Sequence, residues 1–486
     1  MSSSAGSTNE RKLRQAQRIC RTLEELGPLY IKVGQILATR PDFVPQHVRD
    51  ELERLNDQVA VRPYTHFETI LEEDLGADWR LDFQYIQDDE PLGSASLAQV
   101  YKAMTREGKP CVIKIQRPGA RQSVTDDMRV LRAVGRSISA LAPRFNEVVD
   151  VPAMIAILFK AMEDELDFTR EAQNMKDARK AAREFKHVSV PKVLRATPRV
   201  LVQSLAEGTP INRLKPGYLS RKKSKKVSYE LMEFMFRGYF LERIFHADPH
   251  PGNIIVSPDG VAHIIDWGMV GRIDRNTSAA LLGCFMALAQ NNGEALARQW
   301  VRLGTATPWN NTNAFIQDVS RLIPHWTDAT LAELNFGVAL MSLLRYSSRR
   351  GIQITPVVSV AGKSIANIEG SIRFLNPDLK LSTALRKSMR GILPELLSRE
   401  ITPLLAADIG LSALHSLHNA PMQVQAALAD LAGHQTTMQM RTNLGDPIDS
   451  GPRHRGTPPH RISPMTGLFL LAWRATRKKG ASDHPN

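Results

Sequence analysis

The chain has 486 residues, of which 43% are hydrophobic and 23% charged, and its formal net charge is +13. This balance indicates a globular protein with more than one core and excludes a chain that is disordered throughout. Its cysteines, Cys20, Cys111 and Cys284, stand far apart, which argues against a disulfide framework or a zinc site. The start of the chain is polar, without an apolar signal segment, so the sequence predicts a cytoplasmic protein with reduced thiols.

The first 80 residues have a helical pattern. Apolar side chains spaced three and four apart, with breaks at Gly27-Pro28 and after residue 40, predict helices at 11–26, 29–39 and 46–58. Lys32 and Gln35 stand three residues apart in the second of these helices, so they share one side of it. We therefore expect a helical N-terminal extension over residues 1–80.

Residues 81–205 change to a pattern of short strands. Alternating apolar residues at 81–85, a segment of small residues at 93–96 and an apolar run at 111–115 predict antiparallel hairpins. A helix at about 152–181 and strands near 188–194 and 200–205 complete this part. The pattern predicts a small lobe that combines a sheet with a helix.

From residue 206 the pattern is mostly helical, with one interruption. A strongly apolar helix at 229–245 precedes a polar loop at 246–253 and a hairpin of two short strands. We expect a helical lobe at 206–400 and a tail at 401–486, in which residues 441–464 read as a linker rich in proline and glycine. The predicted fold class is α+β, in two lobes with helical additions at both ends.

The chemistry of phosphoryl transfer needs a clamp for phosphates, a divalent metal and a carboxylate that orients the acceptor. Lys114 ends a strand, where it can reach phosphate oxygens if a carboxylate holds it extended, and Glu171 on the later helix is the candidate partner. Asp248 is followed five residues later by Asn253, which is the interval of a kinase catalytic loop. Asp266, in Asp266-Trp267-Gly268, stands where kinases carry the aspartate that binds magnesium. The sequence therefore predicts ATP and Mg²⁺ as ligands, with Asn253 and Asp266 on the metal.

Two positions of this pattern depart from a protein kinase. Trp267 replaces the usual phenylalanine, which leaves the metal ligand intact but changes the packing beside it. His250 stands where protein kinases usually have a lysine, and both a packing role and a role near the phosphates remain open.

Several motifs together resemble the UbiB family of atypical kinase-like proteins, also called the aarF type, which supports coenzyme Q metabolism. The resemblance covers roughly residues 25–300. In chain order the matching segments are KVGQ at 32–35, PLGSASLAQV at 91–100, KIQRPG at 114–119, ELD at 165–167, EA at 171–172 and HADPHPGN at 246–253.

The resemblance implies roles that the bare residues do not. In this family the helix of Lys32 and Gln35 is thought to lie across the site where a kinase seats a peptide, with Glu165 and Asp167 as polar partners. The small-residue loop would contact the nucleotide, through Gly93, Ser94, Ala95 and Ser96. ATP hydrolysis or chemistry on a quinone or other isoprenoid lipid is then expected in place of protein phosphorylation.

Two other classes of function stay open at this point. One is a nucleotide-binding regulator without turnover, and the other is a phosphotransferase for a small alcohol, of the aminoglycoside or choline kinase type. The helix of Lys32 argues against the second. The sequence leaves the acceptor and the oligomeric state open, a homodimer included.

Basic residues gather in two places. Residues 210–228 hold seven Lys or Arg and no acid, and residues 441–486 hold eight against three Asp. The apolar stretch at 462–473 would span about 18 Å as a helix, short of the roughly 30 Å hydrocarbon core. No nucleic-acid motif accompanies the charge, so we expect no nucleic acid as a partner but peripheral binding to an anionic membrane surface.

Overall fold

The computed structural model describes residues 3–38, 40, 44–52, 54–55, 60–141, 151–323, 336–379 and 381–400. Contacts divide the chain into residues 1–392 and 393–486. The predicted linker and the apolar stretch at 462–473 lie outside the described residues. The predicted division into four parts stays a prediction.

Three helices open the chain: α1 (Ser3–Leu26), α2 (Pro28–Ala38) and α3 (Gln46–Leu52). α1 begins earlier than predicted, and Pro28 is the first residue of α2, where a missing backbone N–H costs no hydrogen bond. Gly34 lets α2 lie close to its neighbours, because a Cβ there would come 2.9 Å from Leu23 of α1 and 2.3 Å from Leu55. This close packing fixes the direction of Lys32, which lies half a turn before Gly34 in the same helix.

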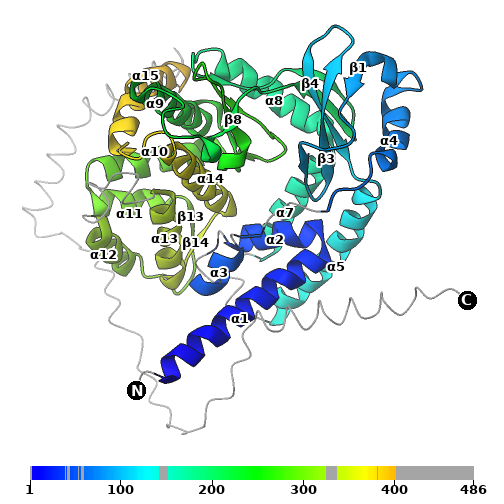
Figure 1. Cartoon of the computed structure of the whole chain (residues 1–486). Coiled ribbons are helices and arrows are strands. Elements are labelled where there is room, and N and C mark those ends of the chain that lie inside the picture. Colours follow the sequence, from blue (N-terminus) through cyan, green and yellow to red (C-terminus); the bar gives the residue numbers. More distant parts are fainter. Residues whose placement is uncertain are drawn as a thin grey trace, which may run out of the picture. The chain divides into compact units, whose positions relative to one another are not determined.

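The small lobe is built on a six-stranded antiparallel sheet in the order β1-β3-β4-β7-β6, with β2 paired to β3. Its strands are β1 (Phe83–Ile86), β2 (Gly93–Ser94), β3 (Ala98–Thr105), β4 (Pro110–Gln116), β6 (Val193–Ala196) and β7 (Val200–Ser204). Helix α4 (Thr65–Leu75), which was not predicted, packs on one face through Phe67 and Leu71 against Tyr101 and Ile113. Figure 1 shows α4 beside the sheet.

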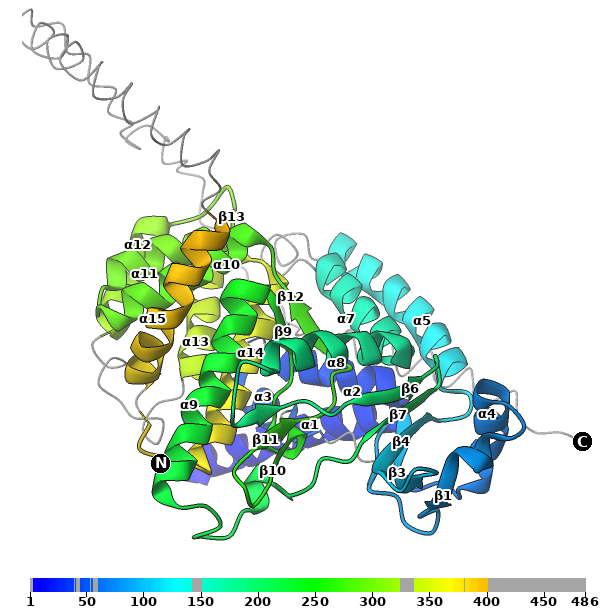
Figure 2. The same ribbon diagram turned by 90° about the horizontal axis from the view of Figure 1, so that it is seen from above.

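The predicted helix at 152–181 is wrong in one respect, because the chain forms two helices there. α7 (Val151–Glu165) ends before Leu166, and α8 (Phe168–Ala182) starts after Asp167, whose side chain accepts a hydrogen bond from the backbone N–H of Thr169. This cap starts a new helix where the apolar pattern alone reads as continuous. An unpredicted helix, α5 (Ala120–Leu141), packs against α7, and α8 runs beside β6 and β7 (Figure 2).

The larger lobe begins with α9 (Arg221–Arg237), so the predicted helix at 229–245 is wrong at both ends. Ser220 caps α9 by accepting from the N–H of Lys223, which places part of the basic run in the helix. A π-helical turn, η3 (Gly238–Glu242), follows, and Arg243 then takes a left-handed conformation that leads into a strand. Strands β9 (Ile244–His246) and β12 (Val270–Arg272) flank residues 247–269 in the sequence and pair with each other.

The hairpin of β10 (Ile254–Val256) and β11 (Ala262–Ile264) confirms the predicted strand pair. It extends into a four-stranded sheet with β5 (Val188–Ser189) and β8 (Thr209–Pro210). The remaining helices are α10 (Arg275–Ala289), α11 (Gly293–Val301), α12 (Thr312–Leu322), α13 (Phe336–Arg349), α14 (Pro356–Arg373) and α15 (Leu381–Glu400), and a two-stranded sheet joins β13 (Gly304–Ala306) to β14 (Ile352–Ile354). Figure 1 shows α9 to α14 gathered away from the small-lobe sheet.

The structure also bears on the cysteine and membrane predictions. Cys20, Cys111 and Cys284 are buried free thiols, as the sequence predicts. Within the described ranges, no helix is both long and apolar enough to cross a bilayer.

Candidate active site

A cavity of about 90 Å³ collects most of the predicted site residues. Its lining comes from α2, the small-residue loop, β4, the ends of α7 and α8, and the segments on either side of the β10–β11 hairpin. The side chains that carry charge or bind through nitrogen or oxygen are Lys32, Ser96, Lys114, Glu165, Glu171, His246, Asp248, His250, Asn253 and Asp266. Residues far apart in the sequence therefore meet at one hollow.

Lys114 enters the cavity from the middle of the sheet. It lies on β4, paired with Val100 of β3 on one side and Leu201 of β7 on the other, so its backbone is held from both sides. Its Nζ donates to Glu171 at 2.9 and 3.1 Å and to Oδ1 of Asp266 at 3.2 Å. The predicted ion pair is formed, and the ammonium bridges it to a second carboxylate.

Lys114, Glu171 and Asp266 shift one another's pKa values. Burial disfavours the ammonium of Lys114, but Asp266 and Glu171 outweigh burial and raise its pKa. The same ammonium holds the pKa of Asp266 well below its ordinary value. Burial raises the pKa of Glu171, against the attraction of Lys114. Asp266 therefore keeps its negative charge, whereas Glu171 is the carboxylate that takes a proton first on acidification.

The backbone of Asp266 has a conformation that few residues other than glycine adopt. Its φ of 59° is left-handed, which is uncommon for a residue other than glycine, and its side chain is 50% exposed. Asn253 also lines the cavity, and its Nδ2 donates to the carbonyl oxygen of Asp248 at 3.2 Å. This bond uses the amide nitrogen, so the amide oxygen of Asn253 remains an acceptor in the cavity that Asp266 also lines.

The donor set fits a magnesium ion held together with phosphates. Asp266 and Asn253 offer the hard oxygen ligands that Mg²⁺ prefers. No group of three or more His, Cys, Asp or Glu in the described part of the chain could hold a metal by itself. Two protein ligands would leave the other coordination positions of a magnesium ion to phosphate or water oxygens, as in kinase sites.

Lys32 reaches the same cavity from the N-terminal extension. Its Nζ lies 2.7 Å from Oε1 of Glu165, and these side chains are 11% and 19% exposed. Gln35 lies on the same helix and is half-buried, but it does not line the cavity. The predicted contact between Lys32 and Glu165 is therefore present, whereas Gln35 is not part of the cavity lining.

The small-residue loop is only partly at the cavity. Ala95 and Ser96 line it, whereas Gly93 and Ser94 form β2 and pair with β3. Arg117 belongs to the KIQRPG motif but had no predicted role, and it holds the loop in place by donating to Oγ of Ser94 at 2.6 Å and to the carbonyl oxygen of Ala95 at 2.8 Å.

Asp167 has a structural task in this fold. Its carboxylate accepts from the backbone N–H of Thr169 at 3.0 Å and from the Thr169 hydroxyl at 2.6 Å, and it does not line the cavity. By capping α8, Asp167 sets the start of the helix that carries Glu171.

Asp248 is held by two residues that no sequence pattern distinguishes from their neighbours. Lys363 and Asn367 of α14 contact its two carboxylate oxygens, at 3.3 and 2.5 Å. They lie more than one hundred residues beyond the loop and have no local motif, so only the tertiary structure reveals them. His250 lines the cavity while its Nδ1 accepts from the N–H of Gly252 at 3.0 Å, so it takes part in the packing of the loop and also faces the cavity.

Trp267 points away from the cavity into the larger lobe. Its indole N–H donates to the carbonyl oxygen of Ile264 at 3.0 Å, and its ring packs edge-on against Phe234 of α9 and His246. Its own carbonyl accepts from Asn174 of α8 at 3.0 Å. Residue 267 thus connects the segment of Asp266 to α8 through its backbone carbonyl and to α9 through its ring.

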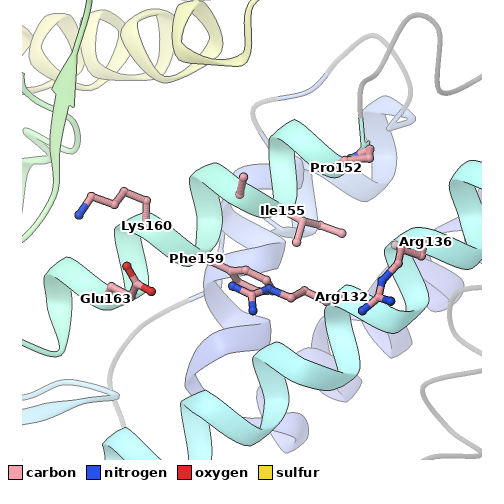
Figure 3. A pocket seen from close by; sticks show the side chains of 9 residues that line it. Arg132, Arg136, Pro152, Ile155, Phe159, Lys160 and Glu163 are labelled. Atoms are coloured by element: carbon pink, nitrogen blue, oxygen red, sulfur yellow. The ribbon is translucent and has the colours of Figure 1, made fainter.

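A larger hollow of about 380 Å³ lies between α5 and α7 (Figure 3). Ile155 and Phe159 form its apolar part, and the guanidinium of Arg132 lies 4.4 Å from the centre of the Phe159 ring. None of the predicted site residues lines it. The smaller cavity is the candidate active site because the opposed charges converge there.

Comparisons with known proteins agree with this geometry. The model of the ABC1 atypical kinase-like domain matches residues 54–300. A "probable protein kinase UbiB" from Pseudomonas entomophila is 32% identical over 384 residues, which cover 76% of this chain and 70% of that protein. An uncharacterised protein encoded in the hydrogenase 1 5′ region of Clostridium pasteurianum is 28% identical over 372 residues, 75% of this chain and 68% of that protein.

Among solved structures, Rv3197 of Mycobacterium tuberculosis in complex with erythromycin superposes with a TM-score of 0.55, at 23% identity, over 80% of this chain and 98% of that one. The likeness confirms the predicted two-lobed kinase-like fold and, at this identity, nothing beyond the fold. Together with the family match, it confirms the resemblance read from the motifs. The chain belongs to the ABC1 atypical kinase-like family, which includes the UbiB proteins.

Proposed function

We propose that this chain binds Mg–ATP in the cavity and cleaves or transfers the γ-phosphoryl group. The observation that carries the proposal is the convergence of Lys114, Glu171, Asp248 and Asp266 on one hollow, with the ammonium of Lys114 between two carboxylates. Phosphoryl transfer relies on placed charges more than on covalent chemistry, so such a group accounts for the main needs of the reaction.

Each residue has a role that follows from its contacts. Lys114, held extended by Glu171, would bind phosphate oxygens of the nucleotide. Asp266 and Asn253 would hold the magnesium ion, which supplies charge neutralisation when it is bound. Asp248 would accept a hydrogen bond from the attacking hydroxyl or water and set its direction.

The position of Lys32 favours a small acceptor over a protein. α2 brings the Lys32–Glu165 pair to the wall of the same cavity, where the pair is largely shielded from solvent. A peptide would have to displace this buried pair to reach Asp248. Slow ATP hydrolysis, or chemistry on a quinone or other isoprenoid lipid as the family resemblance implies, fits this arrangement better than phosphorylation of proteins.

A peripheral association with an anionic membrane surface belongs to the same proposal. Arg221, Lys222, Lys225 and Lys226 are exposed and stand in the first turns of α9, where the helix dipole disfavours positive charge. An anionic surface would offset this repulsion. Lys223 is less available, because its Nζ donates to the carbonyl oxygen of Pro258 at 3.5 Å.

The test is phosphate release from ATP by the purified chain, with and without Mg²⁺ and with anionic vesicles that contain isoprenoid lipid. The proposal expects slow, magnesium-dependent release that Asp248→Asn removes. A wild type that binds Mg–ATP but releases no phosphate under any of these conditions would instead be a nucleotide-binding regulator.

A further inference from the structure

One face of α14 is bonded to the loop that carries Asp248. Oγ of Ser364 donates to the carbonyl oxygen of His246 at 2.5 Å, and Oγ of Ser371 donates to that of Pro249 at 3.0 Å. Between these points, Lys363 and Asn367 contact the Asp248 carboxylate. Positions 363, 367 and 371 are four residues apart, and position 364 stands three before 367 and seven before 371, so the four positions share one side of the helix.

Both oxygens of the Asp248 carboxylate are engaged by this face. Nδ2 of Asn367 donates to Oδ1 at 2.5 Å, and Nζ of Lys363 lies 3.3 Å from Oδ2. The two side chains of the ion pair are 24% and 21% exposed, so water screens the pair only in part. A carboxylate bonded at both oxygens has its rotamer fixed, which is what orientation of an acceptor requires.

The charge of Lys363 complements an unusual feature of the loop. Where protein kinases usually carry a lysine two residues after the aspartate, this loop has His250. The groups around Asp248 are Lys363 on α14, Lys32 on α2 and the loop's own His246 and His250, with the acid Asp266 in the same cavity. Burial raises the pKa of Asp248, but Lys363 first, followed by the other three basic groups, lowers it below its ordinary value.

We propose that α14 supports the catalytic loop through two positioning residues. Asn367 and Lys363 orient the Asp248 carboxylate, and Lys363 also supplies the positive charge for which this loop has no lysine of its own. The inference rests on the proposed function, since Asp248 must act on an acceptor for its aim to matter. It makes the reaction depend on a helix that lies beyond the matched domain at 54–300.

The kinetic test compares Lys363→Met, Lys363→Arg and Asn367→Ala in Mg-dependent ATP hydrolysis. Because Lys363 and Asn367 contact Asp248 and do not themselves line the cavity, kcat should fall by about a hundredfold in Lys363→Met and Asn367→Ala while KM for ATP stays unchanged. Lys363→Arg, which keeps the positive charge next to Asp248, should restore most of the kcat that Lys363→Met loses. Lys192→Met, at an exposed lysine of the small lobe, is the matched control and should behave as the wild type.

A second readout separates this proposal from the proposed function. Hydrogen exchange of residues 244–256, followed by mass spectrometry, should quicken in the double variant Lys363→Met with Asn367→Ala, whether or not ATP is hydrolysed. A wild type without ATP hydrolysis would overturn the proposed function, and exchange would then show whether α14 holds the loop. Unchanged exchange in the double variant, or an unchanged kcat of Lys363→Met and Asn367→Ala in an active protein, would overturn the role of α14.

Discussion

Two parts of the chain build the cavity in different ways. Residues 54–300 bring Lys114, Glu171, Asp248 and Asp266, the parts of a nucleotide site that any kinase-like fold needs. Two helices from outside that range, α2 and α14, each add one lysine to a carboxylate, Lys32 to Glu165 and Lys363 to Asp248. In the proposed function, the first part would handle the nucleotide, and the second part would constrain what the nucleotide can react with.

The two parts also differ in how firmly their charges are held. Lys114 stands on a strand that is bonded to neighbours on both sides, so its direction comes from the sheet. Lys32 depends on helix packing around Gly34, and Lys363 on one face of α14. Changes in the central part should therefore abolish nucleotide binding, whereas changes in the outer helices should alter acceptor choice or turnover.

The largest effect is expected at the metal ligand. Asp266→Asn removes a negative oxygen ligand and the partner of Lys114, so Mg-dependent binding of ATP should be lost while the fold persists. Calorimetric titration with ATP, with and without Mg²⁺, measures this, and circular dichroism checks the fold. Magnesium-dependent affinity equal to that of the wild type in a folded variant would refute the metal assignment.

Acidification should weaken the central part through Glu171. As the pH falls through its raised pKa, Glu171 takes up a proton and loses the charge that holds Lys114 extended, so the affinity for Mg–ATP should fall. Asp266, whose pKa is lowered, stays ionised over the same range. Binding measured across pH should decline on the acid side in the wild type and stay weak and flat in Glu171→Gln. An equal pH dependence in both proteins would contradict this reading.

Removing Lys32 should open the site and cost stability. Lys32→Met removes the ammonium that pairs with the largely buried Glu165, which should lower the free energy of unfolding by about 3 kcal/mol, and adding Glu165→Gln should recover most of it. Urea unfolding measures the first effect. Phosphorylation of added proteins should rise from a very low level in the double variant. Strong phosphorylation of many proteins by the wild type would show that α2 does not restrict access.

The smallest effect is expected at the basic start of α9. Each basic residue near an anionic surface contributes about 1 kcal/mol, so neutralising Lys222, Lys225 and Lys226 should weaken binding to anionic vesicles without changing ATP binding. Co-sedimentation at low and high salt tests this, with Lys180→Gln on α8 as an exposed control. No binding at low salt would end the membrane proposal, and salt-resistant binding would point to insertion in its place.

The central part was readable from the sequence, and the outer part mostly was not. Asp248 and Asn253 are five residues apart, and only a short hairpin separates them from Asp266. Residues so close in the chain stay close in space, so their meeting could be predicted from the sequence. Lys363 lies 115 residues from Asp248, and nothing in the pattern of α14 distinguishes its site face from an ordinary packed face. Lys32 was found only through the family resemblance, since a lone helix lysine is usually solvated.

The predicted helix boundaries are wrong where a single capping side chain decides where a helix starts. Asp167 caps a second helix within an apolar pattern that reads as one continuous helix, and Ser220 starts α9 eight residues before the predicted start at residue 229. Caps compete with propensity by amounts of about 1 kcal/mol, too little to stand out in a pattern that is dominated by burial.

The most direct test of the account is nucleotide turnover at Asp248. Phosphate release from Mg–ATP is measured for the wild type and for Asp248→Asn, with ATP binding measured in parallel. The account predicts slow release by the wild type, loss of release in Asp248→Asn, and ATP binding by both proteins. Equal rates of release from the two proteins would contradict the assignment of this cavity as the active site.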